Sequence, residues 1–303
     1  MNARSNERTD KYIETDLACE SGKLSPEEYR SAKYEKKTMG EVIVETLTVS
    51  DDEGVSESGK KIGTYVTISD DSPRSEKDVS LLSEIIEAEL KKLFETIFGK
   101  CPDENTKVLI AGLGNRFVTP DALGSKCADK INATRHIKDA YPVLDGMGCA
   151  DVSVISPGVL GQTGIESSEI LRGISRRIGP DLIIAIDAMA ARKVSRLATT
   201  VQISDAGLSP GGGIGNNRPE IDKESMGCPV ISIGSPTVVG SSTLITDALE
   251  EAGITDISPA LEKILENGKS FFVTLNDSDR IIERISDAIS CAINNLFGTT
   301  FLT

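Results

Sequence analysis

Several residue types are scarce in this sequence, and each scarcity excludes a class of protein. The 303 residues contain no Trp, and Phe, Trp and Tyr together make up 4% of the chain. So few aromatic rings disfavour a surface on which nucleic-acid bases could stack. The formal net charge of −14 argues further against binding to a phosphate backbone, which requires clusters of Lys and Arg. We therefore expect no direct nucleic-acid partner.

Metal-ligand and hydrolase patterns are also missing. The chain has one His, His136, and its six cysteines include no Cys-x-x-Cys pair. Zinc sites are built from closely spaced Cys and His ligands, so we expect no metal and no cofactor. Scattered cysteines in such a chain indicate reduced, individually packed thiols. With one His, expected to be a solvated helix-end residue, and no Gly-x-Ser-x-Gly, a Ser–His–Asp hydrolase has little support.

Long hydrophobic segments are absent as well. No stretch approaches the ~18 consecutive apolar residues of a transmembrane helix, and the N-terminus lacks the apolar run of a signal peptide. We therefore expect a soluble, cytoplasmic protein without membrane contact. Residues 1–40 hold eight Lys/Arg and eight Asp/Glu, so the whole net charge of −14 belongs to residues 41–303. The first segment thus differs in kind from the body.

What is present is the pattern of an α/β fold. Val/Ile/Thr-rich runs at 41–50 and 61–69 predict a β-hairpin within 41–70, an N-terminal β-rich extension. From residue 107 strands and helices alternate, which predicts an α/β fold with a mostly parallel or mixed sheet flanked by helices. The expected strands are 107–112, 151–156, 181–187, 199–204 and 228–233, and the expected helices are 26–37, 79–98, 120–135, 165–178, 242–252 and 280–296.

Two aspartates, Asp121 and Asp187, follow two of the apolar runs that predict buried strands. Ligands of open α/β sheets bind beyond the carboxyl ends of the strands. If the two strands are neighbours, both carboxylates enter one crevice, where they could activate a water or hold a metal. Structural roles are alternatives: Asp121 could cap the following helix, and Asp187 could pair with Arg192. Cys127 could be a nucleophile near Asp121, but helix packing explains it better.

Three glycine-rich segments lie near these strands. The Gly112-Leu-Gly114-Asn115 turn lacks the third glycine of a dinucleotide fingerprint, and it is better explained as a strand end that brings Asn115 to the crevice. Residues 156–166 form a turn in which Thr163 and Glu166 would make a capping box, and Gly164 would let a peptide or anion approach. Residues 207–218, with Gly213, form either a substrate lid or a plain surface loop. Candidate substrate-binding residues are therefore Asn115, Thr163, Gly164, Glu166 and Gly213.

Several long strings resemble the germination proteases of spore-forming Firmicutes. They are Val108-Leu-Ile-Ala-Gly-Leu-Gly-Asn115, Val118-Thr-Pro-Asp-Ala-Leu-Gly124, Pro157-Gly-Val-Leu-Gly-Gln-Thr-Gly-Ile-Glu166, Asp181-Leu-Ile-Ile-Ala-Ile-Asp-Ala-Met-Ala-Ala-Arg192 and Thr200-Val-Gln-Ile-Ser-Asp205 with Pro210-Gly-Gly-Gly-Ile-Gly-Asn216. The resemblance covers essentially the whole chain. It implies an α/β sandwich related to hydrogenase-maturation proteases, and a self-processing endopeptidase that degrades small acid-soluble spore proteins in the spore core at germination. It also implies a homotetramer, and it places Asp121 and Asp187 on the family's proposed catalytic pair.

The same resemblance implies a processing site. The family cuts after an acidic residue that precedes a hydrophobic residue and then Ala, and Asp16-Leu17-Ala18 matches this pattern. Residues 1–16 would then be a propeptide, cut between Asp16 and Leu17, and 17–303 a single peptidase domain. One departure is Ile13, which stands where the family favours an acidic residue; Glu14 lies one place nearer to the bond.

The expected mechanism is an aspartate pair that shares a proton and a water, since two adjacent carboxylates cannot both ionise cheaply. Which of the two acts as acid and which as base stays open. Two other readings also stay open: a metal-dependent protease that uses the same carboxylates, and a non-catalytic α/β protein that binds an anion or nucleotide at the turn before Glu166.

Overall fold

A computed structural model describes residues 12–22, 25–70, 76–140, 148–214, 218–254, 257–268 and 271–300. The strands are β1 (Lys33–Met39), β2 (Val42–Val49), β3 (Gly63–Asp70), β4 (Lys107–Gly112), β5 (Asp151–Ile155), β6 (Leu182–Ala190), β7 (Thr200–Ser204), β8 (Val230–Gly240) and β9 (Phe272–Val273). The α-helices are α2 (Asp52–Ser58), α3 (Glu76–Phe98), α4 (Leu123–Lys130), α5 (Arg135–Ala140), α6 (Leu160–Thr163), α7 (Ser167–Ile178), α8 (Lys223–Met226), α9 (Ser241–Glu251), α10 (Pro259–Gly268) and α11 (Ser278–Leu296).

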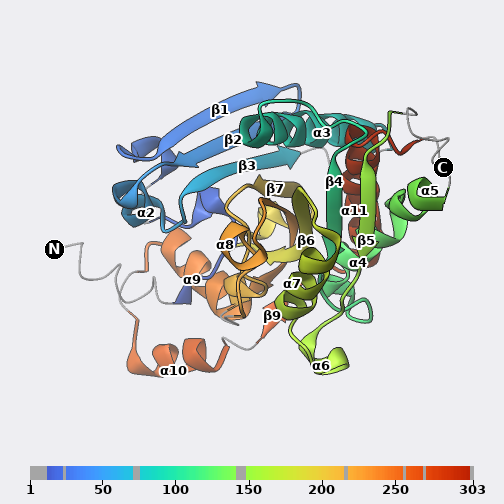
Figure 1. Ribbon diagram of the computed structural model, residues 1–303. Coiled ribbons are helices and arrows are strands. Elements are labelled where there is room, and N and C mark those ends of the chain that lie inside the picture. Colours follow the sequence, from blue (N-terminus) through green and yellow to red (C-terminus); the bar gives the residue numbers. More distant parts are fainter. Residues whose placement is uncertain are drawn as a thin grey trace.

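The strands of the described ranges form one mixed sheet with helices on both faces (Figure 1). Its order is β1-β2-β3-β7-β8-β6-β4-β5, and β9 pairs with the end of β8. The four strands β5, β4, β6 and β8 are parallel, whereas every pair from β8 through β7, β3 and β2 to β1 is antiparallel. The expected α/β class with a mixed sheet is confirmed.

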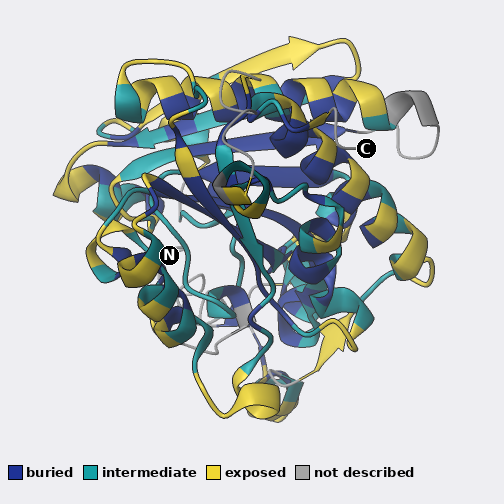
Figure 2. Ribbon diagram, turned by 45° about the vertical axis from the view of Figure 1, so that its right-hand side comes forward, coloured by how far each residue is buried: buried dark blue, intermediate teal, exposed yellow. Residues whose placement is uncertain are grey.

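The parallel strands are apolar on both faces because helices cover both. Along β4 and β6, side chains that point one way join α3, α4 and α11 in the larger core, and those that point the other way join α7 and α8. The period of two in a strand produces this division. Figure 2 shows the result, a buried central sheet surrounded by helices that expose one side to solvent.

Several expectations for the N-terminal part are corrected. Residues 26–37 do not form a helix: only Pro26–Glu28 make a single 3-10 turn, and β1 follows as the exposed edge strand. Pairing with β2 over its full length overrides the local helical pattern. β2 and β3 pair antiparallel, but helix α2 joins them where the sequence had indicated a turn.

Three further differences concern length and number. β8 extends well beyond the expected 228–233, α10 had no predicted counterpart, and the helix expected at 120–135 is confined to α4. β6 continues to Ala190 because β8 pairs with it as far as that residue. None of the helices in the part of the chain that the structure describes is long and apolar enough to span a membrane.

Candidate active site

The site lies where β4 ends beside its neighbour β6. The two strands are parallel, with Gly112 opposite Ile186, and the amide of Leu113 donates to the carbonyl of Ile186 at 2.8 Å. The residue after Ile186 is Asp187. Asp187 lies within β6, which continues for three residues beyond the expected strand end at 187. Its backbone pairs with Gly234 of β8 on one side, next to the last residue of β6 that pairs with β4.

Asp121 reaches the same place by a turn. It ends the 3-10 helix η4 (Thr119–Asp121), and its Oδ2 accepts a hydrogen bond from the amide of Asn115 at 2.7 Å. Gly114 has a φ of +91°, and a Cβ there would collide with the backbone of Asp121, so this close approach requires glycine. The capping alternative for Asp121 is not seen, because Ala122 precedes α4 and no side chain caps that helix.

Asp187 is almost fully buried and has no cationic partner in contact. It is 7% exposed, and its Oδ1 accepts from the amide of Ala188 at 2.9 Å. The alternative pairing with Arg192 is wrong, because that guanidinium bonds to Asp247 and Glu250. Burial first, and then the negative charges of Asp121 and Asp16, raise the pKa of Asp187 well above its ordinary value.

Both aspartates line one cavity of about 380 Å³. Asp16, Gly114 and Arg218 are also among its lining residues. Burial raises the pKa of Asp121, although the hydrogen bond from Asn115 and the charge of Arg218 partly counteract it. Two carboxyl groups with raised pKa values in one cavity can supply a proton donor and a proton acceptor at the same pH.

The third carboxyl group, Asp16, comes from the N-terminal segment. Its amide donates to the carbonyl of Ala190 at 2.9 Å, and its Oδ2 accepts from the amide of Ala190 at 2.8 Å. Burial raises the pKa of Asp16, and the amides of Ala190 and Gly213 and the charge of Lys60 act against that effect. The segment around Asp16 is thus seated along β6, at the same cavity as the aspartate pair.

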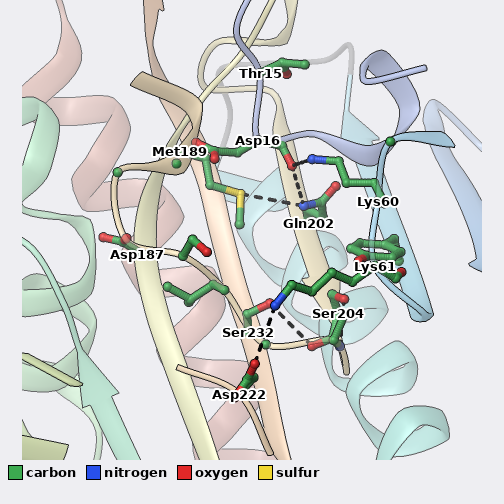
Figure 3. A pocket seen from close by; sticks show the side chains of 18 of the residues that line it. Thr15, Asp16, Lys60, Lys61, Asp187, Met189, Gln202, Ser204, Asp222 and Ser232 are labelled. Atoms are coloured by element: carbon green, nitrogen blue, oxygen red, sulfur yellow. Dashed lines mark hydrogen bonds and ion pairs between the residues drawn. The ribbon is translucent and has the colours of Figure 1, made fainter. Parts of the chain in front are cut away.

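Two residues that sequence reasoning missed contact the backbone of Asp16. Figure 3 shows Lys60, from the connection between α2 and β3, and Gln202, from β7, both directed at the Asp16 carbonyl. A polar Gln in the buried strand β7 was the available signal, because buried polar side chains need a partner. Lys60 carried no signal, since it stands in a polar connection.

The candidate substrate-binding residues do not all gather at the cavity. Asn115 bonds to Asp121, and a Cβ on Gly213 would collide with the Asp16 carboxylate, so these two belong to the site. Thr163 and Gly164 are exposed at the end of α6 and do not line the cavity. Glu166 reaches it indirectly, through an ion pair with Arg218.

The predicted capping box of Thr163 and Glu166 is also wrong. Thr163 closes α6, where its Oγ1 donates to the carbonyl of Ile165 at 2.8 Å. Glu166 precedes α7, but its side chain makes no capping bond. The two residues that the sequence pattern had paired belong to different helices, because Thr163 ends α6 and Glu166 directly precedes α7.

The remaining candidates lie away from the cavity. Cys127 is fully buried in the core beneath α4, and burial raises the pKa of its thiol, so helix packing explains it and nucleophilic attack does not. His136 is exposed on α5. Among the described residues, no three His, Cys, Asp or Glu side chains gather as ligands for a metal ion.

The chain is similar to known proteins over most of its length. The family model described as germination protease matches residues 11–252. A germination protease of Clostridium perfringens (strain ATCC 13124) is 40% identical over 274 residues, which cover 88% of this chain and 81% of the relative. One of Caldanaerobacter subterraneus subsp. tengcongensis is 37% identical over 308 residues and 93% of each chain. Among solved structures, a NiFe hydrogenase maturation protease of Thermococcus kodakarensis KOD1 matches with a TM-score of 0.32 and 19% identity, over 65% of this chain and 98% of that one.

Proposed function

The chain belongs to the germination protease family and is therefore a protease, and from this premise we propose that it is a self-processing endopeptidase that degrades small acid-soluble spore proteins. It cuts after Glu or Asp where a hydrophobic residue follows, and it acts in the spore core during germination. The family resemblance further suggests a homotetramer.

The proposed catalytic groups are Asp121 and Asp187, which share a proton and activate a water. One carboxylate takes a proton from the water as this attacks the scissile carbonyl carbon. The other, protonated, donates to the departing nitrogen. The observation that carries the proposal is that both groups line one cavity and both have a pKa raised by burial.

The proposed processing site is the Asp16–Leu17 bond, with residues 1–16 as the propeptide and 17–303 as the peptidase domain. Asp16 lines the cavity of the aspartate pair, and Leu17 and Ala18 are both fully buried, which supports this assignment. Residues 1–11 lie outside the described part of the chain. With Asp16 in place, the chain's own segment forms part of the wall of the cavity, which would keep substrates out of the unprocessed protein.

Substrate binding is proposed for Gly213 and Asn115 from their contacts with Asp16 and Asp121. Thr163, Gly164 and Glu166 remain candidates for a more distant part of a long substrate. Gly213→Ala should slow processing because its Cβ would displace the Asp16 carboxylate. Gly212→Ala is the matched control, because a Cβ there would lie 3.6 Å from that carboxylate, in ordinary contact.

The deciding experiment follows intact mass over time at mildly acidic pH for the wild type, Asp121→Asn and Asp187→Asn. We expect only the wild type to lose residues 1–16. If all three lose the segment at one rate, an outside protease acts and the aspartate pair is not catalytic. If none does, cleavage of an added small acid-soluble spore protein decides whether the chain is a protease of that substrate.

A further inference from the structure

Two side chains donate hydrogen bonds to the peptide carbonyl oxygen of Asp16. Lys60 Nζ lies 2.8 Å from the Asp16 carbonyl oxygen, and Gln202 Nε2 lies 3.1 Å from it. Figure 3 shows both side chains directed at this oxygen, and Gln202 Nε2 also lies 3.9 Å from Met189 Sδ. Donors at 2.7–3.1 Å from a carbonyl oxygen, one of them charged, have the geometry that stabilises an oxyanion in acyl-transfer enzymes.

The amide of Gln202 also holds the chain beyond the next bond. Its Oε1 accepts a hydrogen bond from the amide of Ala18 at 2.6 Å. Since a peptide N–H can only donate and a carbonyl can only accept, these two contacts define which end of the Gln202 amide is oxygen. One side chain thus bridges the carbonyl before the Asp16–Leu17 bond and the amide of Ala18.

The residues on both sides of the bond sit in separate pockets. The Asp16 carboxylate faces the amides of Ala190 and Gly213. Leu17 is fully buried in an apolar cluster with Met189, Ala191, Leu197 and Val239. Ala18 is fully buried in another cluster, with Leu47, Val49 and Tyr65. Three adjacent pockets therefore accept an acidic, a large apolar and a small side chain in sequence.

We propose that Lys60 and Gln202 are catalytic residues that bind the carbonyl oxygen of the residue before the scissile bond and stabilise the oxyanion formed there. The proposal rests on the proposed function, in which the Asp16–Leu17 bond is the one that is cut. Residues 15–18 then lie in the site as a substrate would, and other substrates place their acidic residue where Asp16 lies.

Hydrolysis of the Asp16–Leu17 bond begins with the attack of a water on the carbonyl carbon. The water oxygen bonds to the Asp16 carbonyl carbon and gives a proton to the ionised carboxylate of the aspartate pair. The carbonyl electrons move onto the oxygen, where the ammonium of Lys60 and the amide N–H of Gln202 receive the negative charge. These electrons return, the C–N bond breaks, and the nitrogen of Leu17 takes a proton from the pair. The products are a carboxyl group on Asp16 and an amine on Leu17.

A purely structural role for Lys60 is the competing explanation, because an ammonium on a peptide carbonyl could simply anchor the segment. Lys61 supplies a matched control. It lines the same pocket as Lys60 and Gln202, a second cavity that shares Asp16 and Asp187 with the cavity of the aspartate pair. Its ammonium is paired with Glu220 and Asp222 rather than with Asp16 (Figure 3). Lys61→Met removes a neighbouring positive charge without touching the carbonyl of Asp16.

The test measures the first-order rate of self-cleavage of the full chain by intact mass. We expect Lys60→Met to slow cleavage by about 10²–10³-fold, the usual loss for one oxyanion donor. Lys61→Met should cleave at the wild-type rate. Gln202→Glu keeps an acceptor for Ala18 and replaces the donor to Asp16 by a carboxylate oxygen, so it should also slow cleavage by at least about 10²-fold.

Docking of the segment is measured separately, by hydrogen exchange of the Asp16 amide in an Asp187→Asn background, which does not cleave under the proposed function. We expect equal protection with and without Lys60→Met. If cleavage and protection fall together by the same factor, Lys60 is an anchor and the proposal is overturned. Wild-type cleavage in Lys60→Met overturns it as well, while inactivity of Asp187→Asn leaves the proposed function intact. A wild type that keeps residues 1–16 overturns the processing site and this proposal with it, while cleavage of an added small acid-soluble spore protein then decides the proposed function separately.

Discussion

Three carboxyl groups, Asp16, Asp121 and Asp187, line one cavity, and burial raises the pKa of each. Of the three, Asp187 has its pKa raised most clearly, because it also feels the charges of the other two. Clustered like charges in a buried site weaken the folded state. At the scale of single residues, the feature that suits this site to acid–base chemistry therefore also makes it unfavourable for stability.

Asp187→Asn should stabilise the protein as it removes activity. A carboxyl whose pKa is higher in the folded state than in the unfolded one binds more protons when folded, so stability falls as pH rises from about 4 through the folded pKa. The variant has no carboxyl at this position, so its stability does not fall with rising pH for this reason. We expect its free energy of unfolding to exceed that of the wild type by roughly 1 kcal/mol at neutral pH. Thermal unfolding of unprocessed protein between pH 4 and 7 measures the difference. A gap that does not widen with pH would contradict the assignment.

At the scale of elements, the position of Asp121 depends on how closely α4 approaches the ends of β4 and β6. Gly124 in α4 lies directly against the backbone of Leu113 and Ile186, and a Cβ there would collide with both. Gly112 faces Gly124 across the same contact. Only glycine lets helix and strands come this near, and the turn with Asp121 connects them.

Gly124→Ala should therefore destabilise the fold by about 1–3 kcal/mol, since backbone atoms cannot move aside as a side chain does. Gly173→Ala in α7 is the control: Gly173 is helical and exposed, with no neighbour in reach of a Cβ, so alanine should stabilise by about 0.5–1 kcal/mol. Urea unfolding of both variants measures the two changes. Equal effects would mean that the close contact of α4 has no energetic importance.

At the scale of the whole molecule, the N-terminal segment connects parts that are distant in the sequence. Residues 16–18 contact β6 and β7, while Tyr12 is buried against Ile257 and Leu265 beside α9 and α10. If residues 1–16 are removed by processing, the apolar side of α10 loses the Tyr12 ring. Processing would thus change the outer helices as well as the cavity.

Processing should raise hydrogen exchange in α10, with its opening free energy lower by about 2 kcal/mol, the value of one buried large side chain. Exchange in α7, which has no contact with Tyr12, is the internal reference. Tyr12→Ala in an unprocessed Asp187→Asn chain should reproduce the change without cleavage. Unchanged exchange of α10 in both proteins would show that Tyr12 does not stabilise this helix.

Much of the parallel half could be predicted from local pattern alone. Continuous apolar runs identified β4, β6 and β7. Strands β4 and β6 are neighbours, and both Asp121, which follows β4, and Asp187, in β6, line one cavity as expected. Such strands are readable because burial on both faces leaves little choice of residue. The edge strand β1 was not readable, since it is polar and exists through its pairing with β2.

The sequence by itself determined the fold class, and it predicted the proposed aspartate pair and, through its resemblance to a family, the acidic residue at the proposed processing site. Only the tertiary structure decided what surrounds that site. Asp16, Lys60 and Gln202 come from three distant segments, and no periodicity links their positions. They meet because the N-terminal segment, which bonds to the end of β6 at Ala190, also passes over β7 and β3, where Gln202 and the end of the β2–β3 connection lie. Contacts of this kind depend on strand order, and strand order is a property of the folded sheet.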